Sequence, residues 1–160
     1  MIMSKSVRAL ILVSAAACAA CAPGATIPEP STTLAPANPF ETAFAQQPGV
    51  RPVTWGGWIQ TMTPGTGASP NADNIVKVNY RGTLTDGTEF DSSYKRNAPA
   101  TFSLRNVIPC WTNGVPMMKV GEKAKFVCPP SAAYGDGGSP PLIPGGATLV
   151  FEIELLDIVR

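Results

Sequence analysis

The chain has 160 residues, enough for one ordinary domain with additional segments and too few for two full domains. Its 17 prolines and 15 glycines argue against long uninterrupted helices. The 12 basic and 11 acidic residues nearly balance, so we expect no nucleic-acid partner, which would require clustered positive charge. The lack of histidine in the sequence excludes Ser-His and Cys-His nucleophile pairs, HExxH zinc sites and imidazole proton shuttles.

Residues 1–21 have the layout of an export signal. Lys5 and Arg8 precede a stretch that is apolar, rich in small residues and too short for an ordinary transmembrane helix. Cys18 and Cys21 lie at its downstream edge, each after two alanines, which resembles a bacterial lipoprotein processing site. We therefore expect export to the periplasm or outer membrane, with a lipid anchor on one of these cysteines. The alternative is a secreted protein cleaved after a small residue, with both cysteines incidental.

Residues 22–52 form a second region by composition. They contain seven prolines among Ala, Thr and Ser, with little charge and only two phenylalanines. Such a segment buries too little apolar surface to offset the entropy lost on ordering, so we expect an extended, mobile linker. After a lipid-anchored cysteine, this linker would let the following domain search the space around its attachment point.

The folded domain is predicted to span residues 53–160, where apolar and polar residues alternate along three segments. Alternation with a period of two is typical of antiparallel strands with one buried face and one solvated face. We also expect a strand over residues 58–63 and a tight turn at Asp86-Gly87. The apolar positions are Val76, Val78 and Tyr80, then Ala124, Phe126 and Cys128, and finally Leu149, Phe151, Ile153 and Leu155.

One helix is predicted, over the segment that begins at Pro109. This proline suits a first helical position, and Trp111, Val115 and Met118 follow at the spacing i, i+4 and i+7. Pro116 lies too deep for a first-turn proline and removes a backbone donor, so the helix should be short or kinked. The expected fold class is α+β, with a curved antiparallel sheet wrapped around one short helix.

Aromatic residues near the predicted turns are the candidates for a binding pocket. Each of them alone is most simply interpreted as part of the core. The set is more informative, because Tyr80, Asp91 and Tyr134 add polar groups beside apolar positions. An apolar concavity with a few oriented hydrogen-bonding groups is typical of a small-ligand site. The aromatic residues near turns are Phe90, Phe102, Trp111 and Tyr134.

Seven short motifs follow one another along the domain. They are Val-Asn-Tyr-Arg-Gly-Thr-Leu at 78–84, Asp-Gly-Thr-Glu-Phe-Asp-Ser-Ser at 86–93, Val-Ile-Pro-Cys-Trp at 107–111, Met-Lys-Val-Gly-Glu-Lys-Ala at 118–124, Ala-Tyr-Gly at 133–135, Ile-Pro at 143–144 and Ala-Thr-Leu-Val-Phe-Glu-Ile-Glu-Leu-Leu at 147–156. In order and spacing they resemble the FKBP-type (macrolide-binding) peptidyl-prolyl isomerases. The resemblance covers nearly all of residues 53–160 and is far more specific than a lone motif.

The resemblance implies an enzyme that rotates Xaa-Pro peptide bonds between cis and trans and assists protein folding in the cell envelope. The barrier is about 18–20 kcal/mol because of amide resonance. No bond is made or broken, so we expect neither cofactor nor metal. The implied partners are proline-containing unfolded or partner polypeptides and the macrolide inhibitors of the family, and we expect a monomer. The alternative is a non-catalytic chaperone or peptide-binding module that uses the same groove.

The resemblance also assigns roles to ten residues. Trp111 would form a floor beneath the proline ring, and Asp91 would lie near the twisting amide. The Ile108 N–H and the Tyr134 hydroxyl would hydrogen-bond substrate carbonyls. A twisted amide is less dipolar than a planar one, so a dry pocket would favour the transition state. We count Phe90 with these four as catalytic, and the substrate-binding walls would be Tyr80, Phe102, Val107, Ile143 and Phe151.

Two departures from the family pattern concern the pocket walls. Ala100 replaces a second aromatic residue found in many members, which should widen one wall. Ser139, Pro140 and Pro141 stiffen the loop after Tyr134, with an expected effect on selectivity for the residue that precedes proline.

Cys110 and Cys128 form a second informative pair. An exported domain meets oxidising conditions, so we favour a disulfide from the start of the helix to a central strand. The alternative is two buried free thiols that pack as small apolar residues. In the chain-entropy treatment, closing a loop of this size contributes on the order of 3 kcal/mol. Because Cys110 precedes Trp111, a bridge would also fix the pocket floor.

Overall fold

The computed structural model describes residues 38–159. The predicted signal with Cys18 and Cys21, and the linker residues 22–37, lie outside the described residues. Within the described range, no helix is both long enough and apolar enough to cross a bilayer.

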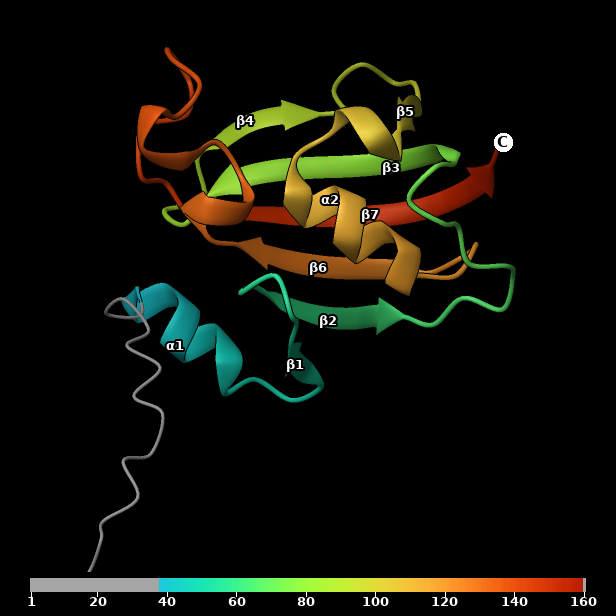
Figure 1. Cartoon of the computed structure of the whole chain (residues 1–160), viewed down its shortest axis with the longest axis horizontal. Helices are drawn as coiled ribbons and strands as arrows, with labels where there is room; N and C mark the ends of the chain where they lie inside the picture. The colour runs from blue at the N-terminus through green and yellow to red at the C-terminus, as the bar shows by residue number, and fades with distance from the viewer. Residues whose placement is uncertain (1–37, 160) are drawn as a thin grey trace, which may run out of the picture. The chain divides into compact units, whose positions relative to one another are not determined.

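One antiparallel sheet of seven strands organises the described part of the chain. The strand order is β1-β2-β6-β7-β3-β4, and β5 pairs with the other half of β3. The long strand β7 lies between β3 and β6 at the centre of the sheet (Figure 1). The strand predicted over residues 58–63 is confirmed as β2, and Asp86-Gly87 forms a turn between β3 and β4. The strands are β1 (Val50–Pro52), β2 (Trp58–Thr63), β3 (Ile75–Leu84), β4 (Glu89–Ser92), β5 (Ala100–Ser103), β6 (Lys123–Cys128) and β7 (Leu149–Ile158).

The face of the sheet that packs on α2 is apolar along its length, as the alternating pattern predicts. On β3, Val76, Val78 and Tyr80 are buried, and Lys77 between them is exposed. Successive side chains of a strand point to opposite faces, so every second residue enters the same core. The other predicted core positions are also buried, namely Ala124, Phe126, Cys128, Leu149, Phe151, Ile153 and Leu155.

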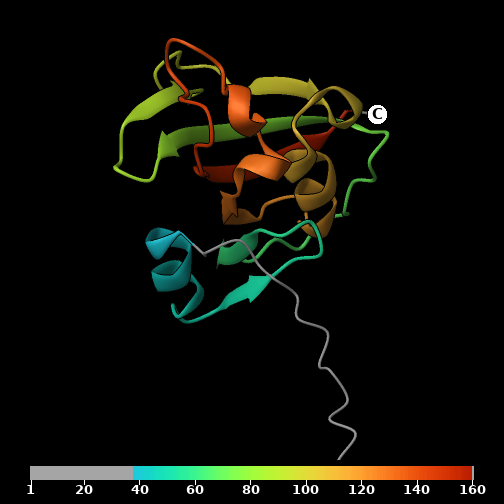
Figure 2. The ribbon, with the colours of Figure 1, turned by 60° about the vertical axis from the view of Figure 1, so that its left-hand side comes forward.

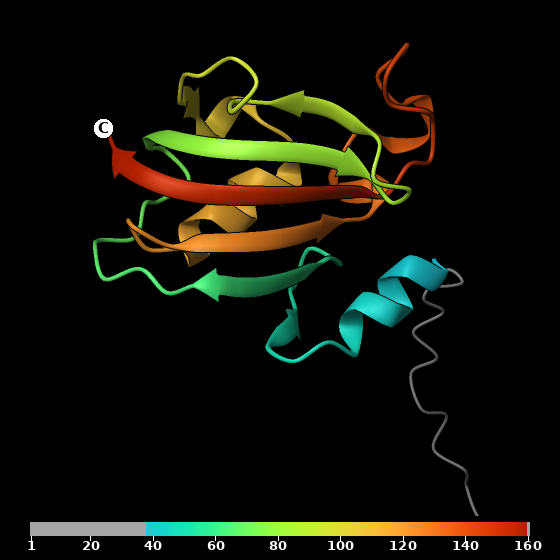
Figure 3. The ribbon, with the colours of Figure 1, turned by 180° about the vertical axis from the view of Figure 1, so that it is seen from behind.

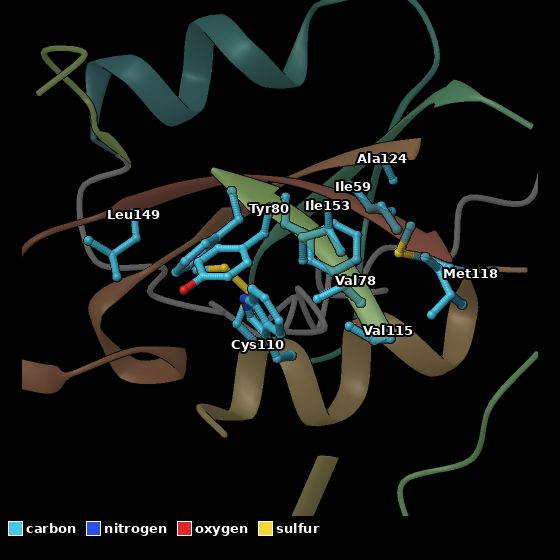
Figure 4. Close-up of a cluster of buried hydrophobic side chains, with 14 of the residues drawn as sticks. Ile59, Val78, Tyr80, Cys110, Val115, Met118, Ala124, Leu149 and Ile153 are labelled. Atoms are coloured by element: carbon cyan, nitrogen blue, oxygen red, sulfur yellow. A yellow bond between two sulfur atoms is a disulfide. The ribbon is translucent and has the colours of Figure 1, made fainter. Parts of the chain in front are cut away.

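The predicted short helix is confirmed as α2 (Pro109–Gly114), which lies across this apolar face (Figure 1). It continues into the 3-10 turn η2 (Val115–Met117), which contains Pro116. Proline cannot donate the next α-helical hydrogen bond, so the chain tightens and the helix ends. Val115 and Met118 point from this segment toward Val78 and Ile153 on the strands (Figure 4).

Three further 3-10 turns complete the described elements. They are η1 (Leu104–Asn106), η3 (Pro130–Ala132) and η4 (Gly135–Gly137). η3 and η4 lie on the same side of the sheet as α2 (Figures 1 and 2). This side of the sheet therefore carries both the helix and the loops that follow β6.

The predicted disulfide is confirmed. It joins Cys110 in the first turn of α2 to Cys128 at the end of β6, with a Cα–Cα distance of 5.8 Å. Both cysteines are fully buried in the main core, where Cys110 appears in Figure 4. The sequence separation of 18 residues closes a loop that contains most of α2 and all of η2.

The prediction of a mobile linker is wrong for residues 38–52. This stretch forms α1 (Pro39–Ala45) and β1, and Phe44 is only 2% exposed. Asn38 caps the helix by accepting a hydrogen bond from the Phe40 N–H at 3.0 Å, and Pro39 occupies the first turn. The two phenylalanines of this poorly charged segment are spaced i, i+4, so they share one helix face. The buried Phe44, the pairing of β1 with β2 and a hydrogen bond of 2.8 Å from the Thr148 hydroxyl to Glu41 together dock the segment.

The face opposite α2 is consequently not solvated throughout. Phe44 packs against Val127 of β6 and Val150 of β7, which point away from the main core, and Trp58 adjoins this cluster. Figure 3 shows α1 near the end of the sheet where these strands meet. The prediction of one wet face therefore fails at this corner, because the chain's own helix covers it.

Candidate active site

A cavity of about 680 Å³ opens on the α2 side of the sheet. Its walls come from β3, β4, β5, β7, the turn before α2 and the loop after η4, so residues distant in sequence meet there. All ten residues that the sequence predicts for the site line this cavity. They are Tyr80, Phe90, Asp91, Phe102, Val107, Ile108, Trp111, Tyr134, Ile143 and Phe151.

The floor of the cavity is built around Trp111, which is 4% exposed. Its ring centroid lies 5.4 Å from those of Tyr80, Phe102 and Phe151, with interplanar angles of 84–86°. Edge-to-face contacts of this kind add about 0.5–1.5 kcal/mol each to the burial of the rings. Helix α2 and the strands together therefore present a packed aromatic surface that lines the open cavity.

Hydrogen-bond donors without a protein acceptor are found around this floor. Within residues 38–159, the Trp111 indole N–H is buried and has no acceptor. In the same range neither the Ile108 backbone N–H nor the Tyr134 hydroxyl makes a hydrogen bond. Tyr134 is 43% exposed at the cavity edge. Buried polar groups are normally paired, so the unpaired indole N–H is unusual, and all three donors are available to the carbonyls of a bound ligand.

One charged network lies at the edge of the cavity. The Tyr80 hydroxyl donates a hydrogen bond to Asp91, whose other carboxylate oxygen pairs with Arg96. A second Arg96 nitrogen donates to the Tyr80 hydroxyl oxygen at 2.8 Å, and the guanidinium lies 5.5 Å from the Tyr80 ring centroid. The three side chains hold one another in place.

This network sets the protonation of its members. Burial acts to raise the pKa of Asp91, but hydrogen bonds from Tyr80 and Arg96 and the charge of Arg96 outweigh it, so the pKa lies below its ordinary value. Burial and the hydrogen bond to the carboxylate raise the pKa of Tyr80 above its ordinary value. The carboxylate is therefore ionised and the phenol keeps its proton at neutral pH.

Arg96 is a residue of the site that sequence reasoning missed. It lies in the loop between β4 and β5, which Ser93 folds back onto β3 by exchanging two hydrogen bonds of 2.9 Å with the Tyr80 backbone. Asn97 adopts a left-handed φ of 51°, which helps the loop reverse direction. The sequence did contain a signal for Arg96, because it lies five residues after Asp91 and an acidic residue at a pocket edge favours a basic partner nearby.

Two other lining residues were also not predicted, Asn106 and Leu142. Leu142 is held by the loop after η4, in which Ser139 and Ile143 exchange backbone hydrogen bonds of 2.8 and 3.0 Å. Ser139, Pro140 and Pro141 also line the cavity, and their effect on selectivity for the residue before proline stays a prediction. Ala100 lies on β5 opposite Val78 and is not among the lining residues.

Comparisons with known proteins agree with this geometry. The family profile described as FKBP-type peptidyl-prolyl cis-trans isomerase matches residues 67–156. The chain is 53% identical over 121 residues to the FKBP-type peptidyl-prolyl cis-trans isomerase FkpA of Aeromonas hydrophila. The aligned region covers 76% of this chain and 45% of that protein. The chain is 48% identical over 105 residues to FK506-binding protein 1A of Emericella nidulans, covering 62% of this chain and 95% of that protein.

A solved structure shares the fold. The crystal structure of FkpA from Escherichia coli superposes with a TM-score of 0.72 at 46% identity, covering 74% of this chain and 55% of that chain. The chain spans less than half the length of the FkpA proteins of Aeromonas hydrophila and Escherichia coli strain K12, 45% and 44%. The antiparallel sheet around a short helix, the aromatic cavity and the family match lead to one conclusion. This chain belongs to the FKBP-type peptidyl-prolyl cis-trans isomerase family.

Proposed function

We propose that this chain catalyses the cis-trans isomerisation of Xaa-Pro peptide bonds. The observation that carries the proposal is the apolar cavity with the Trp111 indole as its floor and hydrogen-bond donors without acceptors around it. Its volume and mostly apolar lining suit a proline ring with its neighbouring residues. The proposed ligands are accordingly proline-containing polypeptides. The macrolide inhibitors of the family are proposed as a second class of ligand for the same apolar cavity.

The mechanism that we propose needs no reactive side chain. A proline ring seated on Trp111 is held while the peptide bond before it rotates. The Ile108 N–H and the Tyr134 hydroxyl are the proposed donors to the carbonyls on either side. At the transition state the amide has lost resonance and part of its dipole, so an apolar site destabilises it less than the planar ground state. The ionised Asp91, fixed by Tyr80 and Arg96, lies at the edge of the cavity near the proposed position of that amide.

Exchange NMR on a short Xaa-Pro peptide tests this proposal. We expect wild-type protein to accelerate cis-trans exchange and Tyr134→Phe to slow the accelerated rate about threefold, because one hydrogen bond is worth about 0.5–1.5 kcal/mol. Tyr94→Phe is the matched control, since Tyr94 is similarly exposed at 45% but does not line the cavity. Equal exchange with and without the wild-type protein would leave a peptide-binding module as the function.

We further propose that the chain is exported and attached to a membrane by a lipid on Cys18 or Cys21. The basic and apolar layout of residues 1–21 supports this, and so does the disulfide, because disulfides persist in oxidising compartments. Changing both cysteines to serine should move the protein from the membrane fraction to the soluble fraction of cells. Wild-type protein found already in the soluble fraction would instead favour a secreted form without a lipid, and a serine variant that stays in the membrane fraction would contradict attachment through these cysteines.

A further inference from the structure

We propose that the Cys110–Cys128 disulfide is a positioning element of the active site, which holds the first turn of α2 so that Trp111 and the Ile108 N–H keep their working geometry. This inference rests on the isomerase activity proposed above. Cys110 directly precedes Trp111 and follows Ile108 by two residues, so the bridge attaches to the same helical turn as both groups. Neither cysteine lines the cavity, and both are fully buried behind it.

The indole has no polar anchor of its own. Its N–H lacks an acceptor within the described residues, so no hydrogen bond fixes the orientation of the ring. Its contacts with Tyr80, Phe102 and Phe151 are edge-to-face packing at 5.4 Å. Aromatic packing tolerates sliding and rotation better than a hydrogen bond does, because its energy varies slowly with angle. The position of the indole therefore depends on the backbone that carries it.

That backbone has little helical stability of its own. α2 has six residues, its N-cap is Ile108 with no side-chain cap, and Pro116 interrupts the segment soon after its end. A helix of this length does not persist in isolation, because the cost of nucleation is not repaid in so few residues. Tertiary contacts must hold it.

α2 is attached to β6 near both of its ends. At the C-terminal end the backbone approaches closely, since a Cβ on Gly114 would lie 2.7 Å from the Phe126 ring. At the N-terminal end the attachment is the covalent bridge to Cys128. The Thr112 hydroxyl donates to the Leu104 carbonyl at 2.7 Å, but this bond leads to η1 and not to the sheet. The bridge is thus a covalent tie between the turn that carries Trp111 and the central sheet, in addition to the ring contacts of the indole.

The test compares full-length protein with and without the bridge. We expect Cys110→Ala/Cys128→Ala to lower kcat/KM about tenfold at temperatures well below its unfolding midpoint, because small displacements of positioning groups reduce rates strongly. The indole N–H resonance of Trp111 should shift and broaden. In a Trp111→Leu background the same pair of changes should lower kcat/KM by less than about threefold, since only the part of the effect that acts through the Ile108 N–H remains.

Phe44→Ala is the matched control, because it removes a buried contact from the opposite face of the sheet. It should lose stability without changing kcat/KM or the Trp111 resonance. If the double alanine variant does not fold, Cys110→Ala/Cys128→Val refills the volume beside the sheet, and wild type refolded with its thiols reduced gives the same comparison.

Three results would overturn the proposal. They are an unchanged kcat/KM without the bridge, an equal loss in the wild-type and Trp111→Leu backgrounds, or an equal loss in Phe44→Ala. If the wild type itself accelerates no exchange, the proposed function has failed and not this inference alone.

Discussion

The two faces of the sheet use the same strands in different ways. On the α2 side, aromatic side chains pack edge to face but leave a cavity of about 680 Å³. On the opposite side, charged side chains form cross-strand ion pairs, such as Lys125 with Glu152 at 3.5 Å. The apolar corner of that side is closed by Phe44 of α1. Apolar area is therefore left for a ligand on one face and filled by the chain itself on the other.

This difference indicates how stability and activity are divided in the molecule. A residue that only fills space, such as Phe44, stabilises the folded state through each of its contacts and does not need an exposed surface. Trp111 contacts three rings edge to face and still lines the open cavity with them. Mutations on the two faces should consequently separate loss of folding from loss of function, and four predictions examine this separation.

The largest effect is expected from Phe44→Ala on the α1 side. Removing a buried phenylalanine costs about 3 kcal/mol of the free energy of unfolding, from lost burial and the cavity left behind. We expect kcat/KM to remain within about twofold of the wild-type value, because the cluster around Phe44 is separate from the core that carries the cavity. Urea unfolding and peptide exchange measure the two quantities. A large loss of activity at temperatures where the variant is folded would contradict the division.

Trp111→Leu should lower kcat/KM more than Phe44→Ala does. Without the indole the cavity floor is lowered, and we expect kcat/KM to fall about 30-fold, which corresponds to about 2 kcal/mol. Exchange NMR measures the rate, and Trp58→Leu serves as a control because Trp58 adjoins the cluster on the other face. Comparable rates for the two tryptophan variants would mean that the floor is not a functional surface.

The charged network at the cavity edge should make the effect of Asp91→Asn on the free energy of unfolding depend on pH. The pKa of Asp91 in the folded protein is below its ordinary value of 3.8, so its ionised form stabilises the folded state above that value. This contribution is lost as the pH falls through the folded-state pKa. The difference in unfolding free energy between wild type and Asp91→Asn should therefore be constant near neutral pH and shrink below about pH 4. Urea unfolding from about pH 3 to 7 measures this difference. If the difference in unfolding free energy between wild type and Asp91→Asn did not change with pH, the prediction would be contradicted.

The smallest effect is expected from Lys125→Met among the ion pairs of the α1 side. Such pairs at partly exposed positions contribute little, because screening and side-chain entropy offset the attraction. The free energy of unfolding should change by less than about 0.5 kcal/mol, and kcat/KM should not change. A loss comparable to that of Phe44→Ala would show that charge, and not apolar packing, stabilises this face.

Local sequence patterns were sufficient for most of the fold. The alternation along residues 75–81 identified the buried side of β3, and Pro116 correctly predicted a short helix. Both signals are local, since a strand shows its buried face every second residue and proline acts on its own hydrogen bond. The cavity residues came from the resemblance to a family, because no local pattern states which strands become neighbours.

Other features depended on tertiary contacts. Phe40 and Phe44 in a proline-rich stretch carry no sign of a partner, and α1 forms because Val127 and Val150 offer them a surface. Arg96 joins the site because the loop after Ser93 folds back on β3.

The amino-acid sequence by itself determined the strands β2, β3, β6 and β7, the interrupted helix and, as a favoured hypothesis, the pairing of Cys110 with Cys128. The resemblance to a family added the residues of the pocket. The tertiary structure decided which apolar surface is closed and which stays open. The physical reason is that burial requires two surfaces in contact. A sequence pattern identifies each apolar surface but does not state which two of them pack together.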